Sequence, residues 1–274
     1  MRIFIMICTI DTGIEKASNV LQEKLKNVSY IVSHQITDEK FKYIPDELNR
    51  PDVVVSQISG AGLSRNRNNA LKLADGDIAL IADDDVTYLP DSFQTILEVF
   101  KNDPELDVAC FKIKTYDNEP EYKNYPDKPY ILTKYNKHSV SSIEIAFRVN
   151  SIRKNCIYFD ERFGLGSEQL PDAEEIVFIQ DCMKSGLKVA YFPVYVVKHH
   201  YYNIPSGDSQ FTSVRNRVRG AYHARVFGWR SVPIALIELF LKMPSIIGNG
   251  RNPLFYAFER FKAIYYIFKT NQRK

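Results

Sequence analysis

The first hundred residues alternate between short apolar runs and stretches with helical spacing, and this alternation constrains the fold most. The apolar runs lie at 2–8, 29–33, 52–56 and 77–82, and the helix-like stretches lie at 14–26, 62–74 and 91–102. Strands that alternate with helices favour βα units and a mainly parallel sheet. Later strand-like runs are less regular, so we expect a mixed sheet. Beyond residue 205 helical patterns replace strands.

Charge is distributed unevenly along this chain, whose net charge is +3. From Lys198 to the end there are 13 Lys/Arg and 3 Asp/Glu, which leaves 23 and 30 for the first 197 residues. We predict a catalytic domain over 1–204 and a basic, helical C-terminal segment over 205–274. Such a basic segment favours an anionic partner. We expect it to act as an anchor on an anionic membrane surface.

Several features indicate a cytoplasmic protein. The four cysteines are far apart and form no CxxC pair, which argues against a disulfide framework. The N-terminus "MRIFIMICTID" is typical of a first strand rather than a signal peptide. The most apolar stretch, "SVPIALIELFLKMPSII", is interrupted by Glu238 and Lys242, so we expect no spanning helix. The expected location is cytoplasmic and peripheral on the inner face of the cell membrane.

Three consecutive carboxylates end the apolar run at 78–82. In open α/β sheets, ligands bind outside the carboxyl ends of the strands, where Asp83, Asp84 and Asp85 stand. In an extended chain Asp83 and Asp85 project to one side and Asp84 to the other. Two carboxylates so placed repel by roughly 2–3 kcal/mol, and a hard cation such as Mg²⁺ or Mn²⁺ reverses that sign. The alternative is a solvated acidic turn before the next helix.

The surroundings of the triplet, "GAGLSRNRNNALKLADGDIALIADDDV", resemble the inverting glycosyltransferases of family 2, which have the GT-A fold. The matching positions are Arg67 and Asn68 for the family's "RN" pair, Asp83 and Asp85 for its DxD motif, and Pro90 and Asp91 for its "PD". The resemblance covers roughly residues 1–200. It implies an α/β fold: a GT-A type Rossmann-like domain with a mixed, mainly parallel sheet, followed by a helical appendage.

The resemblance also implies a metal-dependent, hexosyltransferase-like reaction on a nucleotide diphosphate sugar, most simply a UDP-sugar. Asp85 would hold Mn²⁺ or Mg²⁺, Asp83 would reach the ribose or a metal-bound water, and Asp84 is grouped with the donor-binding residues. Arg67 and Arg65 would contact the nucleotide or diphosphate, because an arginine fork donates two parallel hydrogen bonds. The alternative for both arginines is a solvated helix face.

The first strand ends in "ICTID", where the family commonly has "IPTYN". By this resemblance Thr9 would meet the nucleotide base and Asp11 would stand in for the asparagine. After the second strand, "IVSHQITDE" replaces the family's Asp-Asp-Gly-Ser turn, so the aspartate that would bind uracil is missing. Its candidate replacements are His34, Gln35 and Asp38.

A second acidic cluster, "LPDAEEIVF", aligns with the family's Gly-Glu-Asp motif, in which the aspartate acts as general base. Glu175 takes the place of that aspartate, with Glu174 as the alternative base. A structural alternative also accounts for Glu175: Asp172 would be the N-cap of a helix and Glu175 its N3 residue, which together form a capping box.

Two further residues extend the predicted site. His199 follows Pro193 at the family's proline–histidine spacing and is a candidate metal ligand, although a packed structural histidine is the alternative. Arg215 and Asn216 resemble an "RN" pair that follows the histidine in related enzymes, where a C-terminal lid covers the site. This resemblance implies that the C-terminal segment is such a lid and that Arg215 contacts the diphosphate.

The basic tail predicts two helices. Ser231 is expected to cap a helix that runs through Met243, and Asn252 and Pro253 would begin another. The second helix carries an apolar stripe over 254–268 flanked by lysines. Such a stripe favours either an in-plane membrane helix or packing on the catalytic domain.

The leading hypothesis is an inverting glycosyltransferase of cell-surface polysaccharide biosynthesis. Its partners would be a nucleotide-sugar donor and a glycan or lipid-linked acceptor, and we expect no nucleic-acid partner. One rival is a sugar-phosphate nucleotidyltransferase, which needs a glycine-rich loop that "TIDTGIEK" matches poorly. The other is a non-catalytic nucleotide-sugar-binding protein, which the intact acidic pairs disfavour.

Overall fold

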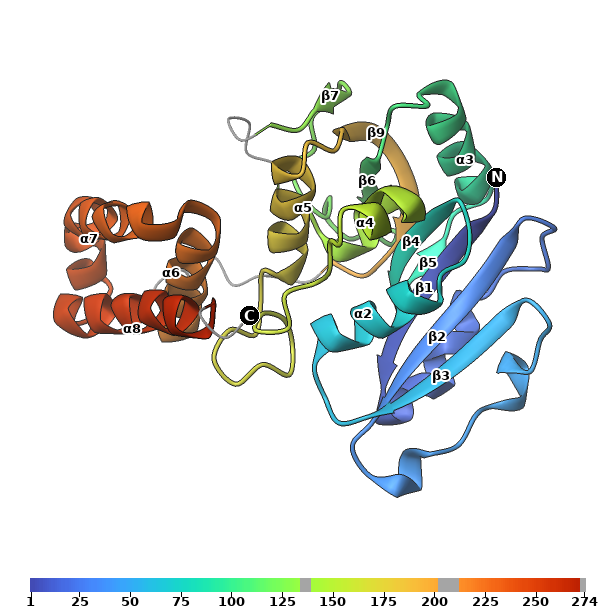
Figure 1. Ribbon diagram of the computed structural model, residues 1–274, viewed down its shortest axis with the longest axis horizontal. Coiled ribbons are helices and arrows are strands. Elements are labelled where there is room, and N and C mark those ends of the chain that lie inside the picture. The colour runs from blue at the N-terminus through green and yellow to red at the C-terminus, as the bar shows by residue number, and fades with distance from the viewer. Residues whose placement is uncertain (134–138, 202–211, 272–274) are drawn as a thin grey trace. The chain divides into compact units, whose positions relative to one another are not determined.

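The computed structural model describes residues 1–133, 139–201 and 212–271, which form two compact units (Figure 1). The first comprises Met1–Phe159 and Phe178–Tyr202, and the second comprises Asp160–Val177 and Asn203–Lys274. The predicted division after residue 204 assigns 160–177 to the catalytic domain, whereas the compact units place this segment with the C-terminal helices. Residues 205–211 and 272–274 of the predicted tail lie outside the described residues.

A mixed, mostly parallel sheet forms the centre of the first unit (Figure 1). Its strands are β1 (Ile3–Ile10), β2 (Val28–Ile36), β3 (Val53–Ser59), β4 (Ile78–Asp83), β5 (Thr87–Tyr88), β6 (Val108–Lys114), β7 (Tyr130–Ile131), β8 (Ile145–Arg148) and β9 (Val189–Lys198). Their order is β3–β2–β1–β4–β8–β6–β9–β5, and β7 also pairs with β9. The strands β3, β2, β1 and β4 are parallel, whereas β8 runs antiparallel to its neighbours. The predicted α/β class with a mixed sheet is confirmed.

Two apolar cores, one on each face of the sheet, attach its helices. These helices are α1 (Ile14–Ala17), α2 (Leu63–Leu73), α3 (Ser92–Asn102), α4 (Val149–Lys154) and, from Phe178 on, α5 (Glu174–Lys184). Alternate residues of a strand face opposite sides. Accordingly Ile5 of β1 belongs to the core of α1 and α3, and Met6 belongs to the core of α2, α4 and α5.

The helix predicted over 14–26 is much shorter in the structure. The α-helical part is α1, and 3₁₀ turns at Asp11–Gly13 and Ser18–Val20 flank it. The side chain of Ser18 donates a hydrogen bond to the carbonyl oxygen of Glu15 over 3.2 Å. Serine and asparagine compete with the helical backbone in this way, which explains why Ser18 and Asn19 end the helix.

The second unit contains α6 (Ser213–Phe227), α7 (Ser231–Gly248) and α8 (Pro253–Asn271), with α7 and α8 side by side (Figure 1). The predicted start of α8 is confirmed, because Asn252 Oδ1 accepts a hydrogen bond from the backbone N–H of Leu254 at 2.9 Å. By contrast, α7 continues through Pro244 and ends at Gly248, five residues beyond the predicted end.

The apolar stripe predicted along α8 is divided between core and surface. Ile264 is buried with residues of α6, and Phe261 packs against the same core. Leu254, Phe258 and Tyr265 are exposed. The stripe is therefore not one continuous membrane-facing surface.

One helical stretch in the described part of the chain, Ser213–Gly248, is long and apolar enough to cross a membrane, and 17% of its most apolar window is buried. This finding concerns length and composition alone, so the expectation of no spanning helix stays a prediction. Core helices of soluble proteins can meet the same criteria.

Ion pairs between arginines and carboxylates link segments of the second unit. Asp160 accepts hydrogen bonds from Arg162 Nη2 at 2.5 Å and from Arg225 Nε of α6 at 2.9 Å. Burial by itself raises the pKa of Asp160, but the two arginines outweigh it and lower the pKa to about 2. The charged carboxylate therefore stabilises the fold.

We expect Asp160→Asn to lower the free energy of unfolding at pH 7 by about 2 kcal/mol. Because the folded-state pKa lies below the unfolded one, this stabilisation is complete above pH 4 and is lost as the pH falls towards 2. Urea unfolding can be followed by the fluorescence of Trp229, the single tryptophan. The difference in free energy of unfolding between wild type and the variant should become smaller as the pH is lowered from 7 to 3. Asp46→Asn, at an exposed carboxylate, is the control. A difference in unfolding free energy that does not change with pH would contradict this account.

Candidate functional site

The carboxyl ends of β1 and β4 lie next to each other and bring together several predicted donor-binding residues. Cys8 of β1 is in register with Asp83 of β4. One residue further along each strand, Thr9 Oγ1 donates a short hydrogen bond to Asp84 Oδ2. Burial first, and then the neighbouring carboxylates, raise the pKa of Asp84 against the opposing effect of Thr9.

The three aspartates contact three different partners. Asp83 Oδ1 lies 3.3 Å from Arg67 Nη2, Asp84 contacts Thr9, and Asp85 Oδ1 lies 3.3 Å from His199 Nε2. The strand ends at Asp83, and Asp84 and Asp85 form a turn. The extended geometry assumed from the sequence is therefore wrong for Asp85, whose neighbours are set by the turn.

The two predicted arginines differ sharply in their environment. Arg67 is 1% exposed, and its guanidinium carbon lies 5.6 Å from the ring centre of Phe159. The solvated-face alternative is therefore wrong for Arg67, whose ion pair orients Asp83. Arg65 is exposed, and its Nη1 donates to the carbonyl oxygen of Ser59 at 2.7 Å.

His199 reaches the aspartates through the pairing of β5 with β9. The register places Thr87 opposite Lys198, so the residues just outside this pair, including Asp85 and His199, meet. His199 is 4% exposed, and its Nδ1 lies 2.8 Å from the carbonyl oxygen of His200. Burial by itself lowers the pKa of His199, but the bonds to Asp85 and to that carbonyl outweigh it, so the pKa is raised.

The chemistry of this pair fits a divalent cation. A carbonyl acceptor at Nδ1 selects, for the neutral ring, the tautomer that carries its lone pair on Nε2, as is usual for histidine ligands of metals. Two adjacent ligands of an octahedral ion at ~2.1 Å lie about 3 Å apart. The 3.3 Å between His199 Nε2 and Asp85 Oδ1 is close to that spacing. Within the described residues, Asp83, Asp85 and His199 do not form a trio with all ligand atoms inside 4.8 Å.

The residues predicted to meet the nucleotide base lie at and just beyond the carboxyl ends of β1 and β2. Both carboxylate oxygens of Asp11 accept hydrogen bonds from Thr37, at 2.8 Å from the backbone N and 2.7 Å from Oγ1. His34 and Gln35 are buried and bonded to the carbonyl oxygens of Asp11 and Gly62. Of the three candidate replacements for the missing aspartate, Asp38 is the exposed one.

Sequence reasoning missed two residues that support this site. A Cβ atom at Gly13 would overlap Thr9 Oγ1 and the carboxylate of Asp84, so a glycine is required beside their hydrogen bond. Asn66 is 1% exposed, and its Nδ2 donates to the carbonyl oxygen of Thr9 at 3.0 Å. Asn66 directly precedes the "RN" pair that carries the family resemblance. Its position next to that motif is the signal by which the sequence could have identified it.

The second acidic cluster belongs to the second unit. Carboxylate oxygens of Asp172, Glu174 and Glu175 lie within 4.8 Å of one another, with Glu174 buried and Glu175 half-buried. Exposed acidic groups of this kind are common without an ion. Its carboxylates are groups that can accept a proton, as a general base must.

The capping box predicted for Glu175 is wrong in register. The helix α5 begins at Glu174, so the residue before it is Ala173 and Glu175 is the second helical residue. The carbonyl oxygen of Ala173 accepts the first helical hydrogen bond, from Val177. Asp172 lies one residue outside, where its Oδ1 accepts from the N–H of Ala173 at 2.8 Å.

Arg215, the remaining predicted donor-binding residue, also belongs to the second unit. It lies in the first turn of α6, and its backbone N–H donates to Thr212 Oγ1 at 3.3 Å, which caps the helix. Its side chain is partly exposed. The roles predicted for Arg215, Glu174 and Glu175 remain predictions.

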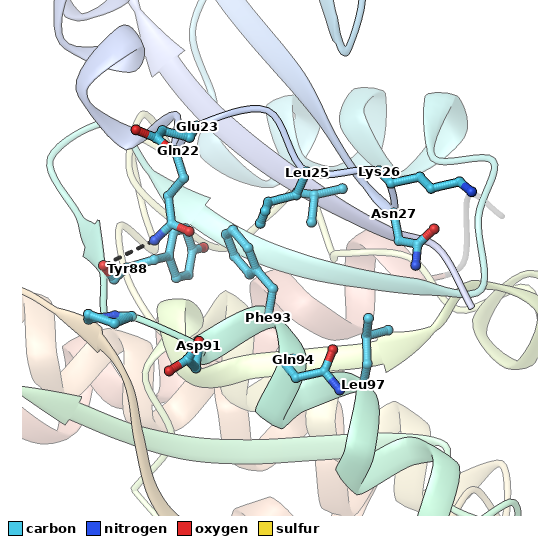
Figure 2. A pocket seen from close by; sticks show the side chains of 12 residues that line it. Gln22, Glu23, Leu25, Lys26, Asn27, Tyr88, Asp91, Phe93, Gln94 and Leu97 are labelled. Atoms are coloured by element: carbon cyan, nitrogen blue, oxygen red, sulfur yellow. Dashed lines mark hydrogen bonds between the residues drawn. The ribbon is translucent and has the colours of Figure 1, made fainter.

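A pocket of about 790 Å³ lies elsewhere in the first unit (Figure 2). The segment 22–28 and the start of α3 line it, and Gln22 Nε2 donates to the carbonyl oxygen of Tyr88 at 3.2 Å. None of the predicted site residues, all of which are described, lines this pocket. We therefore place the candidate site at the strand ends and not in this hollow.

Comparison with known proteins finds similarity to glycosyltransferases. Residues 33–159 match the model "Glycosyl transferase family 2". A curated relative from Haloferax volcanii, a glucosyl-dolichyl phosphate glucuronosyltransferase, is 24% identical over 112 residues, which are 38% of this chain and 36% of that protein.

Crystal structures of S. aureus TarS show the same fold. The TarS chain has a TM-score of 0.58 at 18% identity, over 91% of this chain and 48% of TarS. TarS 1-349 in complex with UDP has a TM-score of 0.59 at 17% identity, over 82% of this chain and 66% of that one. The complex with UDP-GlcNAc has a TM-score of 0.57 at 17% identity, with coverages of 91% and 79%. The predicted GT-A fold is confirmed.

The backbone conformation of Ala173 predicts the effect of a glycine at this position on stability. Its φ of 73° lies in the left-handed region, where a Cβ atom costs roughly 1–2 kcal/mol. Ala173→Gly should therefore raise the free energy of unfolding by about 1 kcal/mol, measured by chemical unfolding. Gly186, whose φ is 79° and whose Cβ would meet nothing within 4 Å, is the matched position. Gly186→Ala should lower stability by a similar amount, and a destabilised Ala173→Gly variant would contradict the argument.

Proposed function

We propose that this glycosyltransferase of family 2 transfers a sugar from a UDP-sugar to a hydroxyl of a glycan or lipid-linked acceptor, with inversion at the anomeric carbon. The single observation that carries the proposal is the constellation at the carboxyl ends of β1 and β4. There Asp83, Asp84 and Asp85 contact Arg67, Thr9 and His199, respectively, at the edge where open α/β sheets bind ligands.

The choice of donor is supported by the structural relatives. S. aureus TarS, which shares the fold, has been crystallised with UDP and with UDP-GlcNAc. In this chain Thr9 would contact the nucleotide base. Asp38 is the exposed carboxylate beyond β2 that would replace the aspartate missing from the uracil site. Arg65, which is exposed, is the arginine available to a phosphate. Arg67 would act by positioning Asp83.

We propose that Asp85 and His199 hold Mn²⁺ or Mg²⁺, with Asp83 beside them. Their 3.3 Å spacing and the carbonyl acceptor at His199 Nδ1 support this assignment. When bound, the cation would neutralise charge on the departing diphosphate. The protein's own contribution is to hold Asp85 and the imidazole in a fixed orientation through the β5–β9 pairing.

We propose Glu175 as the general base, since it matches the family's base position and is more accessible than the buried Glu174. The acceptor oxygen forms a bond to the anomeric carbon while the bond from that carbon to the diphosphate oxygen breaks. The acceptor proton goes to the carboxylate, and the nucleoside diphosphate leaves. A displacement of this kind in one step inverts the anomeric centre.

A lipid-linked acceptor would require the enzyme to work at a membrane surface. The curated relative acts, by its name, on a glucosyl-dolichyl phosphate, which is a lipid-linked sugar. We propose a role in cell-surface polysaccharide biosynthesis, with the protein peripheral on the cytoplasmic face of the cell membrane. Nucleotide-sugar donors and the basic C-terminal segment are both compatible with that location.

The metal assignment predicts that EDTA abolishes sugar transfer and that Mn²⁺ or Mg²⁺ restores it. Asp85→Asn should weaken manganese-dependent UDP binding, measured by calorimetry, by about tenfold or more, because the amide supplies no charge to the cation. Asp117→Asn, at an exposed carboxylate of the same unit, is the control and should bind as wild type does. Full activity in EDTA would remove the metal from the mechanism.

The base assignment predicts that Glu175→Gln lowers turnover by roughly 10²–10⁴-fold and leaves UDP binding unchanged. The loss of one charge from the first turn of α5 should cost under about 1 kcal/mol of stability. Glu174→Gln is the matched variant at the neighbouring position and should be milder. If Glu174→Gln is inactive and Glu175→Gln is normal, the base is Glu174. If both retain normal turnover, neither residue is the base.

A further inference from the structure

We propose that α7 docks on an anionic lipid bilayer through its outer apolar face and lies parallel to the membrane surface. This face consists of the large apolar side chains of α7 that are exposed, together with the preceding tryptophan: Trp229, Val232, Leu236, Ile237, Phe240, Leu241, Met243 and Ile247. The inference adds a docking element to the membrane partner proposed above, and it does not depend on sugar transfer.

The exposure of this face is too large to be incidental. Trp229 is 73% exposed, Phe240 is 74% exposed and Leu241 is 69% exposed. Contiguous apolar surface on a folded protein marks a docking surface, whereas single exposed apolar residues need no explanation. Tryptophan also prefers the boundary between lipid headgroups and acyl chains. The outer apolar face therefore has the composition of a helix that lies at a bilayer surface.

The surrounding charge favours an anionic bilayer as the occupant. The described residues 212–271 contain 10 Lys/Arg and 2 Asp/Glu. Both carboxylates are bonded to arginines, Glu238 to Arg219 and Arg260, and Glu259 to Arg217. The exposed Arg230 and Arg251 flank α7 at its two ends. Anionic headgroups attract such cations, whereas a second copy of this chain docked through the same face would bring two basic helical segments together.

The opposite side of α7 explains why the helix lies on the membrane and does not cross it. Ala235 and Ile246 are buried there. Glu238 on that side forms 2.5 Å ion pairs with Arg219 of α6 and Arg260 of α8. Crossing the bilayer would break these pairs or carry them into hydrocarbon, which is costly. Docking through the outer apolar face leaves every one of these contacts in place.

The test is co-flotation of the full chain with liposomes of neutral phosphatidylcholine or of phosphatidylcholine with 30% phosphatidylserine, a composition chosen for the assay. Wild type should float with the anionic vesicles and be released by alkaline carbonate. The double variant Phe240→Ser/Leu241→Ser should lose binding by about tenfold or more. Leu165→Ser, an equally exposed leucine of the same unit outside α7, is the matched control and should stay within twofold. A urea unfolding transition like that of wild type, followed by the fluorescence of Trp229 in the same unit, would show that the double variant is folded.

Four outcomes would overturn the proposal. Equal flotation of wild type and the double variant would exclude the outer apolar face as the docking surface. If Phe258→Ser releases the protein and the double variant does not, α8 is the anchor. Resistance to alkaline carbonate would indicate a helix that crosses the bilayer. If wild type binds neither kind of vesicle, and sedimentation shows a dimer that the double variant does not form, the outer apolar face is an interface between copies of this chain. Loss of transfer by an enzyme that still floats would count against the proposed function alone.

Discussion

The antiparallel register of β5 against β9 is the constraint on which the candidate site depends. Asp85 and His199 are more than a hundred residues apart, and the pairing of Thr87 with Lys198 brings them to 3.3 Å. The other half of the site follows from the parallel alignment of β1 with β4, which places Thr9 beside Asp84. Each half is held by backbone hydrogen bonds, so the carboxylates are oriented before any ligand arrives. A carboxylate triplet without these two registers would be an ordinary acidic turn.

Features encoded over short stretches could be predicted from the sequence. The helical spacing over 62–74 and 91–102 predicted α2 and α3, and the spacing from Arg67 to Asp85 led to the resemblance to family 2 glycosyltransferases and to the GT-A fold. The Asn252 cap was also predicted, because it depends on two adjacent residues. In each case the information lies within one short, continuous stretch of sequence. Local propensity and spacing are sufficient at that range.

The features that were wrong or missed depend on contacts distant in sequence, or on one backbone angle. Nothing near Arg67 in the sequence shows that Phe159 lies over it and that the side chain is buried. Gly13 resembles any turn glycine until Thr9 and Asp84 are placed beside it. The left-handed conformation of Ala173 moves the helix start by one residue and removes the predicted capping box. Tertiary packing also divided the apolar stripe of α8 between core and surface.

The strand order has a consequence for biosynthesis of the protein. The strands β1 to β4 pair among themselves and are complete once residue 83 has left the ribosome. The other edge of the sheet is assembled around β9, which pairs with β5, β6 and β7 and is the last strand to be made. A nascent chain therefore exposes Asp85 for about a hundred residues of synthesis before His199 can reach it, roughly 5–20 seconds at ribosomal rates. During that interval the growing polypeptide is half of a GT-A domain with an open sheet edge, and such an edge is exposed to aggregation and to chaperones.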